Sequence, residues 1–142
     1  AAAALGYTGS DLGQQVANFA LQFVGNPYVY GGNSLTNGID CSAFTKAIYA
    51  NFGYKLPRSA MSQLYVGKSI SVNQLLPGDL VLYHREDGFV YHVTMYIGNN
   101  MLMKNGKLSP KYLICKLHIL LFNIITLFFH ICNASFAKII TL

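Results

Sequence analysis

Apolar residues recur every three or four positions between residues 12 and 23, which predicts an amphipathic helix. Ser10 precedes this run as a helix cap, and Gly25 ends it. The next stretch, up to residue 39, is rich in Gly and Asn and predicts an extended piece followed by a loop.

A second helical stripe begins at Cys41 and ends at Gly53, a residue type suited to the position just after a helix. Asp40 precedes this helix and is expected to cap it, so that Cys41 lies in the first turn. A third, shorter helix is predicted after a proline, with Ser59 as its cap and Gly67 as its stop.

The second half of the sequence contains strand patterns. Residues 75–84 predict a turn followed by a strand, and the Asp87-Gly88 pair predicts a hairpin. In the clear strand pattern of residues 89–100, the aliphatic side chains fall on one face and His92 on the other. Helices that come first and antiparallel strands that follow indicate an α+β fold.

The sequence from residue 113 onward departs from these patterns, because it has no glycine, no proline and no acidic residue. Three interpretations stay open: strands that complete the sheet, a weak membrane-associated segment, or a sequence not selected for this fold, such as a frame-shifted C-terminus. Its most apolar stretch, residues 119–129, is short for a membrane span, which needs about 20 residues. We therefore divide the chain into a linker (1–9), a main domain (10–103) and a compositionally foreign tail (104–142).

The net charge of +5 does not indicate a nucleic-acid partner. The first 100 residues hold five basic and five acidic side chains, so the whole excess lies in the tail rather than on a patch of the main domain. The first eleven residues lack the basic and apolar regions of a signal peptide and are typical of a linker. We expect a monomer without a firm membrane span.

Three cysteines cannot form a disulfide framework, so Cys41 is expected to be a lone thiol. The tail holds two cysteines and two histidines at a loosely zinc-like spacing, but no turn residues separate them. We therefore predict no metal site and no cofactor. The four tail residues are Cys115, His118, His130 and Cys132.

The position of Cys41 favours a nucleophile over a buried structural thiol, which is the more common role of cysteine. The first turn of a helix offers free N–H groups and a positive dipole end, which are expected to lower the thiol pKa. A cysteine nucleophile also needs a histidine base, and His92 is the candidate. His84 is the competitor, but it ends a strand beside a charged turn. A cysteine on a helix that faces a histidine on a strand is the arrangement of papain-like hydrolases.

Five motifs occur in order: GNPYVYGG, GIDCSAF, LPRSAMSQ, LLPGDLVLY and HVTMYIGN. Together they make residues 10–103 resemble the NlpC-type family of bacterial cell-wall cysteine peptidases. The resemblance implies a papain-like α+β fold and a secreted or cell-wall-associated enzyme that hydrolyses an amide bond in peptidoglycan stem peptides. The implied bond joins D-glutamate, through its γ-carboxyl group, to the following diamino acid. Cleavage of the muramoyl–L-alanine bond is an alternative for the same Cys–His pair.

The resemblance also implies roles for individual residues. Cys41 matches the nucleophile and His92 the general base. The implied substrate-binding residues are Tyr30 near the oxyanion, Asp40 and Ser42 at the free amine of the stem peptide, and Arg58, Ser59 and Gln63 along the cleft.

The sequence departs mildly from the family pattern at Ala43 and Thr94, and more seriously at the third catalytic position. A polar residue, commonly histidine, should orient the ring of His92, and Lys104 aligns with it. A charged lysine has no lone pair to accept a ring N–H. Asn105 has an acceptor, but on a strand it would point to the other face. Two function classes therefore stay open: an active endopeptidase, and a catalytically impaired derivative that acts at most as a cell-wall binding module.

Overall fold

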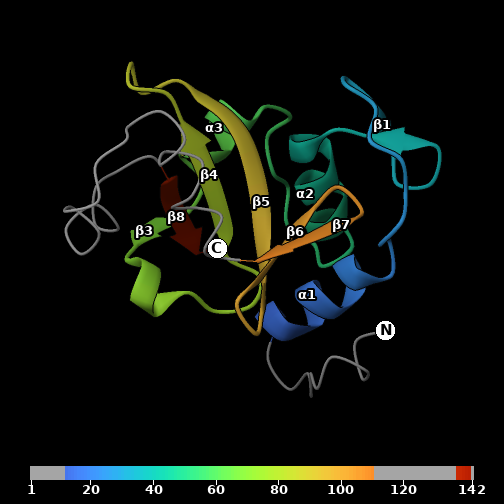
Figure 1. Ribbon diagram of the computed structural model, residues 1–142, viewed down its shortest axis with the longest axis horizontal. Coiled ribbons are helices and arrows are strands. Elements are labelled where there is room, and N and C mark those ends of the chain that lie inside the picture. The colour runs from blue at the N-terminus through green and yellow to red at the C-terminus, as the bar shows by residue number, and fades with distance from the viewer. Residues whose placement is uncertain (1–11, 111–136, 142) are drawn as a thin grey trace, which may run out of the picture.

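The computed structural model of the chain describes residues 12–110 and 137–141. Within these residues, three α-helices pack on a six-stranded antiparallel sheet, and a two-stranded sheet precedes α2 in the chain (Figure 1). The α+β fold predicted from the sequence is confirmed. The helices are α1 (Leu12–Leu21), α2 (Cys41–Ala50) and α3 (Ala60–Gln63), with a 3₁₀ turn at Val72–Gln74.

The large sheet has the strand order β3-β8-β4-β5-β6-β7, and every pair in it is antiparallel. Its strands are β3 (Lys68–Ile70), β4 (Leu80–His84), β5 (Val90–Gly98), β6 (Met101–Lys104), β7 (Lys107–Pro110) and β8 (Ala137–Thr141). The small sheet consists of β1 (Asn33–Ser34) and β2 (Gly38–Ile39).

The helix caps follow the sequence prediction. The carboxylate of Asp40 accepts the backbone N–H of Ala43 at 2.9 Å, which satisfies a donor in the first turn of α2. The hydroxyl of Ser59 accepts the N–H of Ser62 at 3.1 Å and caps α3 in the same way. Gly53 follows α2 with φ of +84°, the left-handed conformation expected of glycine there.

Two tight hairpins extend the sheet beyond β5. Asn99 and Asn100 connect β5 to β6, and Asn105 and Gly106 connect β6 to β7. All four residues have positive φ, as two-residue hairpin turns require. The expectation that Asn105 lies on a strand was therefore wrong: its backbone turns the chain, and the Asn-Gly pair is itself a hairpin signal that the sequence offered.

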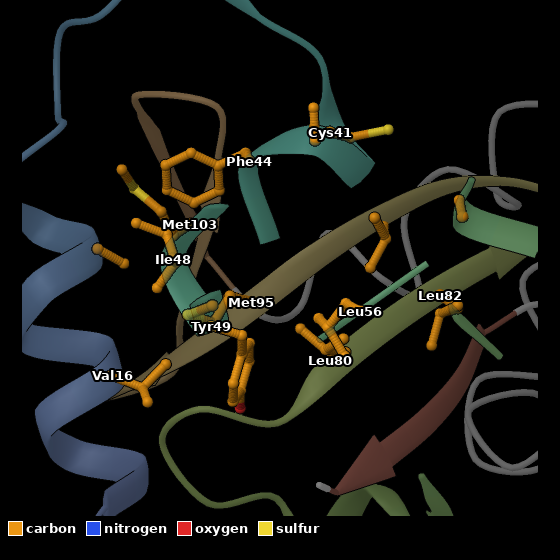
Figure 2. Packing of buried hydrophobic residues seen from close by; sticks show 14 of the residues in the cluster. Val16, Cys41, Phe44, Ile48, Tyr49, Leu56, Leu80, Leu82, Met95 and Met103 are labelled. Atoms are coloured by element: carbon orange, nitrogen blue, oxygen red, sulfur yellow. The ribbon is translucent and has the colours of Figure 1, made fainter. Parts of the chain in front are cut away.

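The sheet separates two apolar clusters. The larger one fills the space between the sheet and the helices α1 and α2, and Figure 2 shows part of it around Phe44, Ile48 and Met95. The smaller one lies on the opposite face, because the side chains of a strand alternate between faces. The buried members of the smaller cluster are Val81, Tyr96, Leu102 and Ile139.

β8 lies inside the sheet rather than at its edge. It pairs with β3 on one side and with β4 on the other, and Ile140 is fully buried against the larger cluster. Residues 137–141 therefore fit the interpretation in which the tail completes the sheet. The linker 1–9 and the apolar stretch 119–129 lie outside the described residues, and the division at residue 103 stays a prediction. No helix in the described ranges is both long and apolar enough to span a membrane.

Candidate active site

Cys41 occupies the first position of α2, at the margin of the larger apolar cluster. Figure 2 shows its sulfur directed away from Phe44, which points into the cluster from the same helix. The thiol lies against the backbone N–H of Val93 on β5. Because Val93 follows His92 directly, the fold brings the cysteine of the helix to the strand that carries the histidine.

The environment of Cys41 raises the pKa of its thiol. Burial is the main cause, since the side chain is only 9% exposed, and the negative charge of Asp40 adds to it. The backbone N–H groups of Val93 and Ser42 act in the opposite direction but do not outweigh burial. The expectation that the helix start lowers the thiol pKa was therefore wrong in its net direction. At neutral pH the Cys41 thiol is therefore protonated.

His92 lies on the other face of β5, as its alternation with the aliphatic residues predicts. Its ring approaches that of Tyr83 on β4 with centroids 5.6 Å apart. The ring atom Nε2 is buried and has no hydrogen-bond partner, so Nδ1 is the nitrogen that remains accessible. No hydrogen bond joins the His92 ring to the thiol of Cys41 in the described part of the chain. Catalytic hydrogen bonds are often long or poorly aligned in proteins without substrate and tighten when substrate binds.

Lys104 lies on the same face as His92, on the neighbouring strand. Met95 pairs with Met103 in the β5–β6 register, so one further step puts Lys104 opposite Thr94, two residues from His92. Burial lowers the pKa of His92, and the charge of Lys104 lowers it further, to about 4. The imidazole is therefore neutral at physiological pH.

The predicted substrate residues Asp40, Ser42 and Arg58 bind one another. The Arg58 guanidinium donates to both carboxylate oxygens of Asp40, at 2.6 and 2.9 Å, and to the hydroxyl of Ser42 at 3.1 Å. Asp40 also accepts the N–H of Gly31, at 3.2 Å, besides its cap bond. Burial alone would raise the pKa of Asp40, but these hydrogen bonds and the charge of Arg58 bring it below its usual value. The carboxylate is thus ionised and already has its partners.

Gln63 is fully buried and belongs to the interior of the protein. Its amide N–H₂ group donates to the carbonyls of Ser42 and Pro57, both at 2.9 Å, and its carbonyl accepts the hydroxyl of Thr45 at 2.8 Å. The prediction that Gln63 lines the cleft was wrong, because the side chain is fully buried and its hydrogen bonds lie inside the protein. Its role is to fix the first turn of α2 to the segment before α3. Ser59, by contrast, is exposed and serves as the helix cap.

Tyr28 is the tyrosine that interacts electrostatically with Cys41. Burial raises its pKa, and the charge of Cys41 is the second cause, so its hydroxyl lies near the thiol. Tyr30, the predicted neighbour of the oxyanion, is 90% exposed in a turn. The sequence PYVY contains both tyrosines two residues apart. In an extended segment they fall on the same side, so alternation does not distinguish Tyr28 from Tyr30.

Three or more His, Cys, Asp or Glu side chains do not gather into a possible metal site anywhere in residues 12–110 and 137–141. The four tail residues with zinc-like spacing lie outside these ranges. Cys41 is the free cysteine of the described part of the chain.

Comparisons with known proteins agree on one family. Residues 25–114 match the model of the NlpC/P60 family. The chain is 41% identical over 83 residues to the probable endopeptidase NlpC homolog of Haemophilus influenzae, covering 58% of this chain and 43% of that protein. It is 36% identical over 87 residues to the gamma-D-glutamyl-L-lysine dipeptidyl-peptidase of Bacillus subtilis, covering 60% of this chain and 29% of that protein. The chain thus spans less than half the length of either relative.

The fold is also similar to solved structures. An NlpC/P60 family protein from Bacillus cereus superposes with a TM-score of 0.64 at 30% sequence identity, covering 72% of this chain and 36% of that chain.

Proposed function

Because the chain belongs to the NlpC/P60 family, we propose that it is a cysteine endopeptidase that hydrolyses an amide bond in the stem peptides of peptidoglycan. The observation that carries this proposal is the thiol of Cys41, which lies at the start of α2 against the strand of His92. The bond is the one between the γ-carboxyl of D-glutamate and the next diamino acid, the linkage that the name of the Bacillus subtilis relative describes.

The protonation states define how the reaction begins. With a thiol pKa raised by burial and an imidazole pKa of about 4, the resting pair is neutral thiol and neutral imidazole rather than an ion pair. His92 therefore acts as a general base: its accessible Nδ1 takes the proton of Cys41 as the sulfur attacks the substrate carbonyl.

Later steps use donors already present around the sulfur. Attack forms a C–S bond and moves the carbonyl electrons onto oxygen, and N–H groups near the thiol together with the Tyr28 hydroxyl stabilise that oxyanion. The protonated His92 then gives its proton to the leaving amine, and the C–N bond breaks. Water, deprotonated by the same ring, hydrolyses the thioester and regenerates Cys41.

The substrate places the reaction in the cell wall, so we propose that the enzyme works outside the cytoplasm. Cleavage of the muramoyl–L-alanine bond is the competing enzymatic activity, because the same pair of residues can attack either amide. The two activities release different products from one muropeptide, and product masses separate them.

A direct test uses the purified chain with defined stem peptides, read by mass spectrometry. We expect products cut after D-glutamate, and no turnover by Cys41→Ala. Turnover that survives Cys41→Ala contradicts the nucleophile assignment. Products cut at the muramoyl–L-alanine bond contradict the proposed bond but not the enzyme class.

A second function, peptidoglycan binding without turnover, is favoured by one observation. The buried Nε2 of His92 lacks an acceptor, and the cation of Lys104 lies on its face of the sheet. An imidazole base whose other nitrogen is not held by an acceptor is poorly oriented. Binding of stem peptides by the parent chain without any product supports this second function.

A further inference from the structure

We propose that Arg58 is a positioning residue for the nucleophile: its guanidinium holds the Asp40 carboxylate at the cap of α2 and offsets the negative charge beside Cys41. This inference rests on the proposed function only in taking Cys41 as the nucleophile. It replaces the substrate contact that the sequence suggested for Arg58 with a role inside the protein.

The contacts of Arg58 converge on the residues that flank Cys41. Two guanidinium nitrogens bind the two oxygens of Asp40, the residue before the cysteine, in a bidentate pair. One of them also binds the hydroxyl of Ser42, the residue after it. The remaining donors reach Asn33, at 2.8 Å, and the carbonyl of Gly32. The side chain thus ties the small sheet to both neighbours of the nucleophile.

Within the ion pair, the side chain of Asp40 is less exposed to solvent than that of Arg58. The side chain of Asp40 is 10% exposed, and that of Arg58 is 39% exposed. Without the guanidinium, Asp40 would be a nearly buried carboxylate adjacent to a thiol that must become a thiolate. A like charge at that position disfavours ionisation of the sulfur.

The charged and titratable groups that act on the thiol come from four elements. Asp40 caps α2 and raises its pKa, Tyr28 lies on the loop before β1, and Arg58 precedes α3. His92 lies on β5, beside the Val93 N–H group that contacts the sulfur. Of these groups, Arg58 is the one that is cationic throughout the working pH range.

The arrangement also explains why the cation is arginine. A bidentate pair needs two parallel N–H groups in a plane, which a lysine ammonium does not have. Lysine at this position would retain the charge but lose at least one of the bonds to Asp40 and the bond to Asn33. Charge and geometry can therefore be separated by substitution.

The test is the pH dependence of Cys41 alkylation by iodoacetamide, read on the peptide that contains Cys41, with Cys41→Ala as the blank. We expect Arg58→Met to move the thiol pKa upward by about one pH unit. Arg58→Lys should give a smaller shift. Arg85→Met, which removes an exposed arginine paired with Asp87 in the β4–β5 hairpin, should leave the profile unchanged.

A second measurement isolates the charge. Asp40→Asn retains a capping oxygen but removes the negative charge, so it should lower the thiol pKa, and Arg58→Met should shift the profile less in this background. An unchanged profile in folded Arg58→Met, or equal shifts in both backgrounds, overturns the proposal. If Arg58→Met does not fold, Asp40→Asn alone still decides: a thiol pKa that does not fall contradicts the role of the charge.

The outcome is independent of turnover. Alkylation reports the thiol even if the chain hydrolyses no stem peptide, so a failed proposal for Arg58 leaves the proposed function standing. A chain without peptidase activity would in turn still show the Arg58 effect.

Discussion

The protonation of His92 depends on the neighbours that share its face of the sheet. Tyr83 covers one side of the ring, the buried Nε2 has no partner, and Lys104 adds a positive charge. Burial and the charge of Lys104 keep the imidazole neutral, as the proposed general base requires, while the buried Nε2 has no orienting acceptor. The His92 ring thus has the charge state that a base requires, but no hydrogen bond at Nε2 fixes its orientation within the described residues.

Replacing Lys104 is expected to improve catalysis. Lys104→Gln removes the cation and supplies an amide oxygen that can accept the Nε2–H of His92, so kcat should rise by about tenfold or more. Lys104→Met removes the charge without an acceptor and is the matched control. It should raise the pKa of His92 without the full gain in rate. Steady-state hydrolysis of a stem peptide checks both, and a Lys104→Gln enzyme no faster than Lys104→Met would contradict the orienting role.

The same residues determine the pH profile. Because the pKa of His92 is lowered to about 4, the base stays unprotonated down to that pH, and the acid loss of kcat/KM should centre near pH 4 rather than near 6.5. Because burial raises the thiol pKa, the rate should not fall between pH 7 and 8. A pH series of kcat/KM measures both limits. An acid limb near 6.5 would mean that the ring titrates as an ordinary exposed histidine.

At the scale of elements, the segment from Pro57 to Gln63 braces the start of α2 from two sides. Arg58 binds the side chains that flank Cys41, and Gln63 binds the backbone carbonyl of Ser42 and the hydroxyl of Thr45. Cys41 is therefore positioned by a neighbouring segment as well as by its own helix. Such support limits the freedom of a catalytic group, which improves its alignment with a substrate.

Removal of the Gln63 brace should destabilise the whole domain. Gln63→Ala leaves a cavity and two or three buried polar groups without partners, so we expect a loss of about 3 kcal/mol in the free energy of unfolding. Gln22→Ala, at an exposed glutamine after α1, is the control and should change stability by less than about 0.5 kcal/mol. Urea unfolding followed by circular dichroism gives both values. A loss as small as that of Gln22→Ala would refute the buried role.

For the whole molecule, the position of β8 is decisive, because this strand comes from the C-terminal end of the chain yet lies between β3 and β4. Its residues Ile139 and Ile140 are buried on opposite faces of the sheet, one in each apolar cluster. The last strand therefore links the two cores. A chain that ended before β8 would expose the edges of two strands.

Ile140 tests whether this strand contributes to stability. Ile140→Ala should cost about 3 kcal/mol, because it empties a fully buried site between the sheet and the helices. Lys138→Ala, on the same strand but exposed, should be close to neutral. Thermal or urea unfolding compares the two. Equal stability of both variants would mean that β8 does not pack as described.

Local patterns predicted the elements whose signals are local. The caps at Asp40 and Ser59, the helix that starts at Cys41 and the strand that carries His92 all follow from short-range spacing and turn chemistry. The hairpin at Asn105-Gly106 also had a local signal, the Asn-Gly pair itself, but the predicted strand extended over Asn105. β3 and β8 are short, and they pair with each other across some seventy residues of chain, so no local pattern specified that pairing.

The sequence by itself determined that this is an α+β domain with a cysteine at a helix start and a histidine on a strand, because capping and alternation depend on neighbours in the chain. Only the tertiary structure decided the chemical state of the site. Burial of Cys41, the bidentate hold of Arg58 on Asp40, the interior place of Gln63 and the charge of Lys104 beside His92 all arise between elements. Desolvation and ion pairing are properties of three-dimensional surroundings, and residue spacing does not encode them directly.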